Sequence, residues 1–137
     1  MIMKKSKGKP IILAVDDDAF TLQALIHVLS ERYIVHILAN PTELKSILTE
    51  QTIKPDLFLL DYLMPVLSGF DLIPIIREFP EHKNTPIVFL TSVNTIDCLS
   101  AAISLGANDF LSKPFNDSIL FEKIEEHLKE SKKDSQI

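Results

Sequence analysis

Cysteine, tryptophan and glycine are scarce in this sequence, which contains one, none and three of them among 137 residues. The single cysteine, Cys98, excludes an internal disulfide and is typical of a reducing compartment. The four histidines are scattered, and none pairs with the cysteine at metal-ligand spacing, so we expect no zinc site. Positive charge is not in excess either. The formal net charge of −5 argues against direct binding of nucleic acid.

Long apolar runs are also missing. The first apolar run, residues 11–15, is shorter than the ~7–15 apolar residues of a secretory signal, and no run approaches the ~20 residues that cross a bilayer. We therefore expect a cytoplasmic protein with no membrane partner. The composition predicts a flexible basic tail over residues 1–9, one domain over residues 10–129, and a C-terminal tail or linker remnant over residues 130–137.

Short apolar stretches do recur along the chain, and they have the character of strands buried on both faces. They cover residues 11–15, 33–38, 56–60, 87–90 and 110–111. Apolar residues at helical spacing follow each of them, within residues 22–29, 44–48, 70–79, 96–103 and 119–128. Strands that alternate with helices through short connections imply parallel strands and right-handed crossovers. We predict an α/β fold, a doubly wound five-stranded parallel sheet with helices on both faces.

Local signals mark some helix ends. Gly106 is a predicted C-terminal stop for the fourth helix, and the polar residues 116–118 offer an N-cap for the last one. Pro74 lies inside the predicted helix 70–79, where it removes a hydrogen bond unless it falls in the first turn.

Polar residues follow the predicted strands at their carboxyl ends, where open parallel sheets bind ligands. They are Asp16, Asp17 and Asp18 after the first strand, Asp61 after the third, Thr91 and Ser92 after the fourth, and Lys113 after the fifth. Clustered carboxylates without His or Cys favour a hard cation such as Mg²⁺, and a lysine beside them can hold a phosphoryl group. Together these groups predict a phosphoryl-transfer site.

Each of these residues also has an ordinary structural interpretation when it is taken alone. Any of the acids could be a helix N-cap, and Asp18 fits that role well because helical spacing begins directly after it. Thr91 could form a local turn, and Lys113 could be a solvated loop residue. The joint placement at successive strand ends is what favours a site.

Four stretches of the sequence resemble the receiver domain of response regulators in two-component signalling (CheY-like). They are ILAVDDD at 12–18, LLDYLMP at 59–65 with Gly69, LTS at 90–92 and GANDFLSKPF at 106–115. The similarity covers roughly residues 9–128 in the family's order and spacing, and the set is specific although each piece is weak. It implies a flavodoxin-like (βα)5 receiver fold.

The resemblance implies a role for each acidic residue of the site. Asp61 matches the phosphoacceptor, whose carboxylate attacks a phosphohistidine of a histidine kinase or histidine phosphotransfer protein. Asp17 matches a direct Mg²⁺ ligand, and Asp16 an acid that acts through metal-bound water. Asp61 and the backbone carbonyl of Leu63 complete the implied metal site. Such a switch is not an enzyme, beyond its own phosphorylation and slow dephosphorylation.

The resemblance also implies how the signal leaves the site. Lys113 matches the lysine that pairs with the acceptor, and its bond to Pro114 matches a peptide bond that is usually cis. Thr91 and Phe110 match a hydroxyl residue and an aromatic residue that switch together, although Phe110 fits simple core packing equally well. The output surface would be the fourth helix, fifth strand and fifth helix, which phosphorylation shifts toward binding a downstream protein. Homodimerisation stays open.

Two departures from the commoner family pattern lie near the site. Leu63 and Val93 are apolar at the positions two residues after the acceptor and after the threonine, which predicts slow self-dephosphorylation because water is excluded. Ser68 precedes Gly69 where an acid is frequent, and we expect little consequence.

Two other functions compete with this interpretation. A haloacid-dehalogenase-like phosphatase also uses an aspartate nucleophile and Mg²⁺, but its Asp-x-Asp-x-Thr signature fails here, at Ala19 from one starting aspartate and at Phe20 from the other. A receiver fold that serves only as a binding scaffold would lack the acceptor, the metal acids or the lysine, all of which this sequence has. The family resemblance leaves open whether the domain stands alone or belongs to a hybrid kinase or larger regulator.

Overall fold

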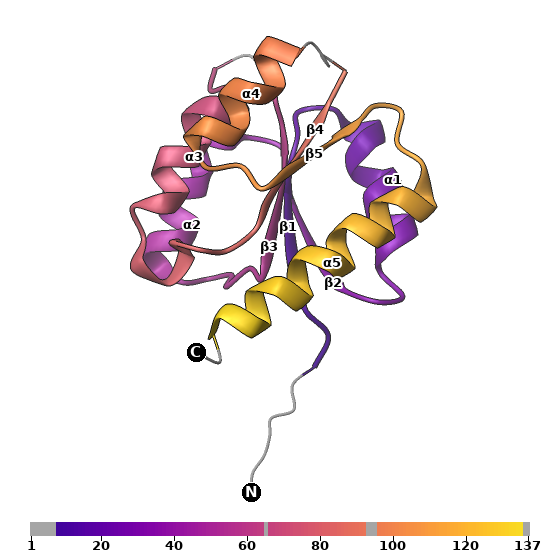
Figure 1. Ribbon diagram of the computed structural model, residues 1–137, viewed down its shortest axis with the longest axis horizontal. Coiled ribbons are helices and arrows are strands. Elements are labelled where there is room, and N and C mark those ends of the chain that lie inside the picture. The colour runs from indigo at the N-terminus through magenta and orange to yellow at the C-terminus, as the bar shows by residue number, and fades with distance from the viewer. Residues whose placement is uncertain (1–7, 65, 93–95, 136–137) are drawn as a thin grey trace, which may run out of the picture.

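The computed structural model describes residues 8–64, 66–92 and 96–135 (Figure 1). Within these residues, all five predicted strands form one parallel sheet in the order β2-β1-β3-β4-β5. Their bounds are β1 Ile11–Val15, β2 Ile34–Leu38, β3 Leu57–Asp61, β4 Ile87–Thr91 and β5 Asp109–Ser112. The predicted doubly wound α/β fold is therefore confirmed, and no strand end differs from the predicted one by more than one residue.

All five predicted helices are present in the described part of the chain. They are α1 Ala19–Leu29, α2 Leu44–Glu50, α3 Gly69–Arg77, α4 Ile96–Leu105 and α5 Asp117–Ser135. Two short 3-10 helices, η1 Pro41–Glu43 and η2 Pro80–His82, were not predicted. Helix α5 continues to Ser135, so residues 130–135 of the predicted C-terminal tail or linker remnant are helical, in keeping with the favourable helix propensity of Lys and Glu. Residues 1–7 of the predicted N-terminal tail lie outside the described residues.

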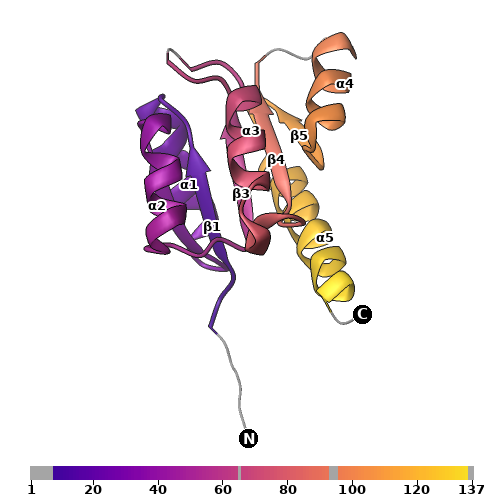
Figure 2. The ribbon, with the colours of Figure 1, turned by 90° about the vertical axis from the view of Figure 1, so that its left-hand side faces the viewer.

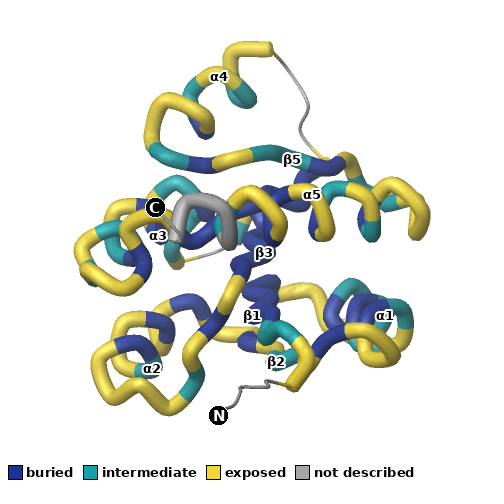
Figure 3. The backbone as a smooth tube through the Cα atoms, turned by 60° about the horizontal axis from the view of Figure 1, so that its bottom comes forward, coloured by how far each residue is buried: buried dark blue, intermediate teal, exposed yellow. Residues whose placement is uncertain are grey.

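The helices form two layers, one on each face of the sheet. Figures 1 and 2 show α1 and α5 on one side, and α2, α3 and α4 on the other. Because side chains alternate along a strand, Ile12 and Ala14 of β1 belong to the core under α1 and α5, whereas Leu13 and Val15 belong to the opposite core. The central strands β1, β3 and β4 are almost entirely buried, whereas the edge strands β2 and β5 are partly exposed. Figure 3 shows the central strands as dark blue tube in the middle of the molecule.

Capping residues define how several helices begin. Asp18 is the N-cap of α1 and accepts from the backbone N–H of Phe20, as the N-cap interpretation predicts. Ser68 begins α3 with a capping box: the Ser68 hydroxyl accepts from the backbone N–H of Asp71, and the Asp71 carboxylate accepts from the backbone N–H of Ser68. The S-x-x-D spacing is typical of this box, so the start of α3 is capped although the acid that is frequent at this position is absent.

Two further signals behave as their chemistry requires. Gly106 follows α4 with φ of 121°, a left-handed conformation that favours glycine, so the predicted stop is confirmed. Pro74 lies beyond the first turn of α3 and removes one backbone hydrogen bond from its interior. The helix ends soon afterwards, at Arg77.

Arg77 closes the amino-terminal edge of the sheet. Its half-buried guanidinium donates hydrogen bonds of 2.6–3.1 Å to four acceptors in the segments that precede β4 and β5: the carbonyl oxygens of His82, Thr85 and Gly106, and Oδ1 of Asn108. One side chain of α3 therefore fixes two loops at once. The opposite edge of the sheet is left for the polar residues at the strand ends.

Candidate functional site

The register of the sheet brings the acids of two strands side by side. Val15 pairs with Leu60, so the next residue of each strand, Asp16 and Asp61, lies at the same level. On its other side Asp61 pairs with Leu90. The two predicted acids, which are far apart in sequence, therefore meet at the carboxyl edge of neighbouring strands.

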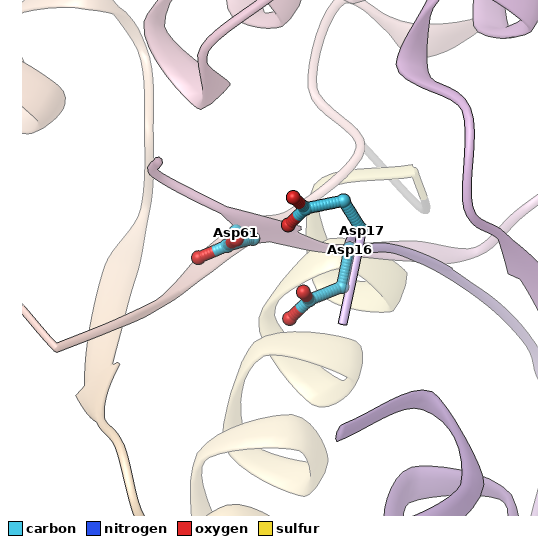
Figure 4. Close-up of side chains that lie close together, drawn as sticks. All are labelled: Asp16, Asp17 and Asp61. Atoms are coloured by element: carbon cyan, nitrogen blue, oxygen red, sulfur yellow. The ribbon is translucent and has the colours of Figure 1, made fainter. Parts of the chain in front are cut away.

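Three carboxylates converge at this edge. One oxygen from each of Asp16, Asp17 and Asp61 lies within 4.8 Å of the others. Figure 4 shows the three side chains close together. Asp16 and Asp61 are 1% and 6% exposed, whereas Asp17 is open to solvent. An all-oxygen set with one exposed member fits a hard divalent cation such as Mg²⁺, which keeps several waters when it binds.

Lys113 supplies the cation of the site. Its Nζ lies 2.8 Å from Oδ2 of Asp16 and 3.2 Å from Oδ1 of Asp61. Its backbone N–H donates to the carbonyl oxygen of Thr91, and its peptide bond to Pro114 is cis. Burial alone would lower the pKa of Lys113, but the hydrogen bond to Asp16 and the charges of both carboxylates outweigh it and raise the pKa. The ammonium is therefore firmly protonated.

The electrostatics make Asp61 the most perturbed acid of the site. Burial raises its pKa from the ordinary 3.8 to about 6, and the charge of Asp16 adds to that effect. Lys113 opposes the rise, but does not cancel it. A carboxylate that is costly to ionise in this pocket gains most from a second cation beside it.

Asp18 has a supporting role rather than a place in the carboxylate cluster. Its backbone N–H donates to Oδ1 of Asp16 at 2.9 Å, and its carboxylate accepts from the hydroxyl of Thr21 at 2.8 Å. The hydrogen bond from Thr21 lowers the pKa of Asp18 more than its slight desolvation raises it. The turn that starts α1 thus orients Asp16 toward Lys113.

Gly69 lets the start of α3 lie against the acceptor strand. Its N–H donates to the carbonyl oxygen of Tyr62 at 2.9 Å, and a Cβ added to it would lie 2.7 Å from the carbonyl oxygen of Asp61. That separation is too short for any side chain, so glycine is required by close approach. The sequence motif contained this residue without giving the reason.

The predicted switch residues lie beside the site. Thr91 ends β4 and is buried, and Phe110 of β5 is half-buried against the core under α2, α3 and α4. Leu63 has a side chain that is 54% exposed, and the role of its carbonyl as a metal ligand stays a prediction. Val93 lies outside the described residues.

An apolar groove next to the site was not predicted. It has a volume of about 360 Å³ and is lined by Phe20, Thr21, Ala24, Val28, Lys113, Pro114, Phe115 and Asp117. The side chain of Phe20 is 88% exposed. The available signal was that Phe20 falls outside the apolar stripe of its helix, which begins at Leu22.

Comparison with known proteins identifies the class of protein to which this site belongs. The family model for the response regulator receiver domain matches residues 12–125. The chain therefore belongs to the receiver family of two-component signalling, whose members are phospho-accepting switches and bind Mg²⁺ at an acidic pocket. This membership favours a signalling switch over the phosphatase alternative.

Individual relatives agree with this assignment. The chain is 34% identical over 117 residues to an uncharacterized 14.6 kDa protein of Leptolyngbya boryana, covering 85% of this chain and 88% of that protein. It is 33% identical over 118 residues to the transcriptional regulatory protein YvrH of Bacillus subtilis, covering 86% of this chain but 48% of the relative. The chain spans about half the length of YvrH, and a smaller share of several other curated relatives.

Solved structures show the same fold. The chemotaxis protein CheY4 of Vibrio cholerae superposes with a TM-score of 0.80 at 29% identity, covering 87% of this chain and 98% of that one. A CheY-like receiver domain protein of Methanospirillum hungatei gives a TM-score of 0.82 at 26% identity, covering 93% and 99%. In the described part of this chain, no helix combines the length and apolar character of a membrane span.

Proposed function

We propose that this domain accepts a phosphoryl group on Asp61 from a histidine kinase or a histidine phosphotransfer protein, with Mg²⁺ at the site. Phosphorylation then shifts the surface formed by α4, β5 and α5 toward binding a downstream protein. The observation that carries the proposal is the convergence of Asp16, Asp17 and Asp61, with the Lys113 ammonium on two of them. A scaffold would not need this charge arrangement, which costs stability.

The chemistry assigned to Asp61 is that of a nucleophile. A carboxylate oxygen attacks the phosphorus of a phosphohistidine, an O–P bond forms, and the P–N bond breaks with its electron pair on the imidazole nitrogen. The raised pKa of about 6 leaves Asp61 ionised at neutral pH. Its burial in a narrow acidic edge keeps the product away from bulk water, and this supports a stored phosphoryl group rather than rapid turnover.

The metal would be held by the carboxylates of Asp16, Asp17 and Asp61 and by the backbone carbonyl of Leu63. When bound, Mg²⁺ neutralises phosphoryl oxygens as negative charge accumulates on them. The donor set supports this assignment because it offers only oxygen ligands and an open side at the exposed Asp17.

Lys113 and Thr91 would respond to the phosphoryl group. In the unphosphorylated site the Lys113 ammonium lies between Asp16 and Asp61, so it is already placed to pair with an added anion. The backbone of Lys113 is tied to Thr91 by a hydrogen bond between neighbouring strand ends. A change at Asp61 can therefore reach β4 and β5 together.

The surface of α4 supports the proposed output face. Ile96 is 80% exposed and Ile103 is 47% exposed, and their spacing of two turns puts them on the same side of the helix. Exposed apolar side chains in such an arrangement are typical of a protein contact. The proposal includes no contact with nucleic acid or membrane, and it places the protein in the cytoplasm, where a histidine kinase would reach it.

The groove at Phe20 supports a protein rather than a small molecule as the phosphodonor. It lies between the start of α1 and the segment after β5, and Lys113 is part of both the groove and the site. A helical donor that packs on Phe20 would bring its phosphohistidine to Asp61. A small phosphodonor would need no such contact.

Phosphorylation by acetyl phosphate, followed by intact-mass spectrometry, tests the acceptor and the metal. We expect one added phosphoryl group on the wild-type protein in the presence of Mg²⁺, none with excess chelator, and none on Asp61→Asn. Asp97→Asn, a change at an exposed acid of α4, is the matched control and should behave as wild type. A phosphorylated Asp61→Asn, or a folded wild type that stays unmodified with Mg²⁺, would refute the proposal.

The groove can be tested separately from the acceptor. Phe20→Ser should slow phosphotransfer from a phosphorylated histidine phosphotransfer protein by about tenfold or more, and leave the rate with acetyl phosphate unchanged. Equal slowing with both donors would mean that Phe20 supports the site itself and not the partner.

A further inference from the structure

We propose that Lys123 of α5 is a positioning residue for Phe110, and that it stabilises the ring orientation of the unphosphorylated state. The inference rests on the proposed function, because it concerns how the aromatic residue of β5 responds to phosphorylation. The juxtaposition that carries it joins two elements: the Nζ of Lys123 lies 5.5 Å from the centroid of the Phe110 ring. That distance is within the range of a cation–π contact.

The ammonium of Lys123 is held in place by a neighbouring carboxylate. Its Nζ lies 2.8 Å from Oδ1 of Asp109, and the side chains of Lys123 and Asp109 are 26% and 21% exposed. The same oxygen accepts from the backbone N–H of Phe110 at 2.8 Å. Asp109 thus ties the cation to the backbone of the residue whose ring it faces.

A second side chain of α5 fixes the carboxylate in turn. Nε2 of His127 lies 2.9 Å from Oδ2 of Asp109, and the imidazole is largely buried. Nδ1 of the same ring faces Glu130 at 3.4 Å. Asp109 therefore keeps a partner if Lys123 is changed, and removal of the lysine amine should not unfold this end of the sheet.

The orientation of the Phe110 ring depends on the groups around it. A phenylalanine has no hydroxyl with which to hold one orientation by a hydrogen bond, so packing and electrostatics must decide where the ring lies. The ring is half-buried against the core under α2, α3 and α4, at the edge strand of the sheet. Lys123 faces it from α5, and so favours the orientation that keeps the ring beside the ammonium.

The consequence follows from linkage. If phosphorylation favours a state in which the ring leaves Lys123, then a cation that holds the ring opposes phosphorylation by the same factor. A half-buried cation–π contact corresponds to roughly a threefold to fivefold change in that equilibrium. Lys123 would then set how far the unphosphorylated protein is biased toward its resting arrangement.

The test uses the full chain and beryllofluoride with Mg²⁺ as a phosphoryl analogue, with affinity measured by titration calorimetry. Lys123→Met keeps the side-chain length and removes the charge, and we expect it to bind about threefold to fivefold more tightly than wild type. Lys123→Arg should restore the wild-type affinity, because a guanidinium also binds an aromatic face. Lys129→Met, at an exposed lysine of the same helix, should have no effect.

A double-mutant comparison separates positioning from a simple salt bridge. In a Phe110→Leu background there is no aromatic ring, so Lys123→Met should no longer change the affinity. The same tightening in both backgrounds, or no tightening in either, overturns the inference, since the lysine would then act only through Asp109 or not at all.

Aromatic NMR of the metal-free protein gives a readout that does not depend on phosphoryl chemistry. We expect the Phe110 ring resonances to move in Lys123→Met and to stay in place in Lys129→Met. Unmoved Phe110 resonances in Lys123→Met sink this inference and leave the proposed function intact. A wild type that fails to bind beryllofluoride, with the NMR result as expected, sinks the proposed function instead.

Discussion

The two edges of the sheet solve opposite problems. At the amino edge, one cation, Arg77, meets four neutral acceptors and joins α3 to the loops before β4 and β5. At the carboxyl edge, three carboxylates converge and the Lys113 ammonium contacts two of them, while burial and the charge of Asp16 raise the pKa of Asp61 to about 6. The contacts at the amino edge stabilise the folded state, whereas the buried charge at the carboxyl edge destabilises it. A functional site can be recognised by the free energy of folding that its buried charges cost.

Missing hydrogen bonds do not explain the cost at the carboxyl edge. Among the described residues, no buried polar side-chain atom lacks a partner. The cost at the carboxyl edge is therefore electrostatic, and comes from the burial of a charged carboxylate and from its like-charged neighbour rather than from missing hydrogen bonds. It can be relieved by a proton, by a cation or by mutation, and each relief is measurable.

The largest effect should come from breaking the amino edge. Arg77→Ala removes the donor from three partly buried carbonyl oxygens, and we expect it to lower the free energy of unfolding by about 3–4 kcal/mol. Urea denaturation followed by circular dichroism measures this. Arg32→Ala is the control, because Arg32 makes an exposed ion pair with Glu125 and a cation–π contact with Phe121, and their loss should cost no more than about 2 kcal/mol. Equal losses in the two variants would contradict the clamp.

The opposite change at the carboxyl edge should stabilise the protein. A pKa of about 6 against 3.8 corresponds to about 3 kcal/mol of penalty for the ionised Asp61 in the folded state. The amide of Asp61→Asn keeps part of the burial cost, so we expect a gain of about 2 kcal/mol at pH 7 without metal.

The sign of this effect fixes its pH dependence. Because the folded pKa of Asp61 lies above the unfolded one, the penalty is complete above about pH 6 and disappears as the pH falls toward 3.8. The stability advantage of Asp61→Asn over wild type, from urea denaturation at each pH, should therefore shrink between pH 7 and pH 4. An advantage that is constant with pH would show that it has another cause.

The affinity for Mg²⁺ should also depend on the ionisation of Asp61. Protons compete with Mg²⁺ for Asp61, so the affinity should be steady above about pH 7 and fall by about tenfold from pH 7 to pH 5. Calorimetric titration with Mg²⁺ at several pH values tests this. Asp97→Asn should follow the wild-type curve. A flat affinity from pH 7 to pH 5 would exclude Asp61 as a ligand.

The smallest effect concerns the access of water to the phosphorylated site. Leu63 is apolar, follows the acceptor by two residues and is about half exposed. Leu63→Asn adds a group that can orient water, and we expect the phosphoryl lifetime to shorten by a few fold, about 1 kcal/mol in barrier. Decay of the phosphorylated protein after removal of the donor measures it. A lifetime equal to or longer than that of the wild type would refute the prediction of slow self-dephosphorylation.

The parts of the structure that could be predicted are those determined by residues close together in the sequence. The apolar runs gave the strands, Gly106 gave the end of α4, and Asp18 gave the start of α1. The end of α5 was not marked by the apolar spacing, which stops near Leu128 whereas the helix continues to Ser135. After Leu128 the favourable helix propensity of the residues continues the helix, although the apolar spacing has ended.

The contacts that could not be predicted join residues far apart in the chain. Nothing near Arg77 in sequence announces the carbonyl oxygen of Gly106 as its acceptor, and nothing near Lys123 announces Asp109. Phe20 was visible as an apolar residue out of pattern, but its exposure beside Lys113 depends on how α1 meets the segment after β5.

The sequence by itself determined the strand and helix order, and with it the carboxyl edge at which acids, threonine and lysine would gather. It could do so because alternation of buried strands and amphipathic helices admits few parallel topologies, and each strand end carries its own polar residue. Only the tertiary structure decided the charge state of that edge, since the pKa of Asp61 depends on its burial and on how closely Asp16 and Lys113 approach. Distances of a few ångströms between distant parts of the chain set those energies, and local sequence does not encode them.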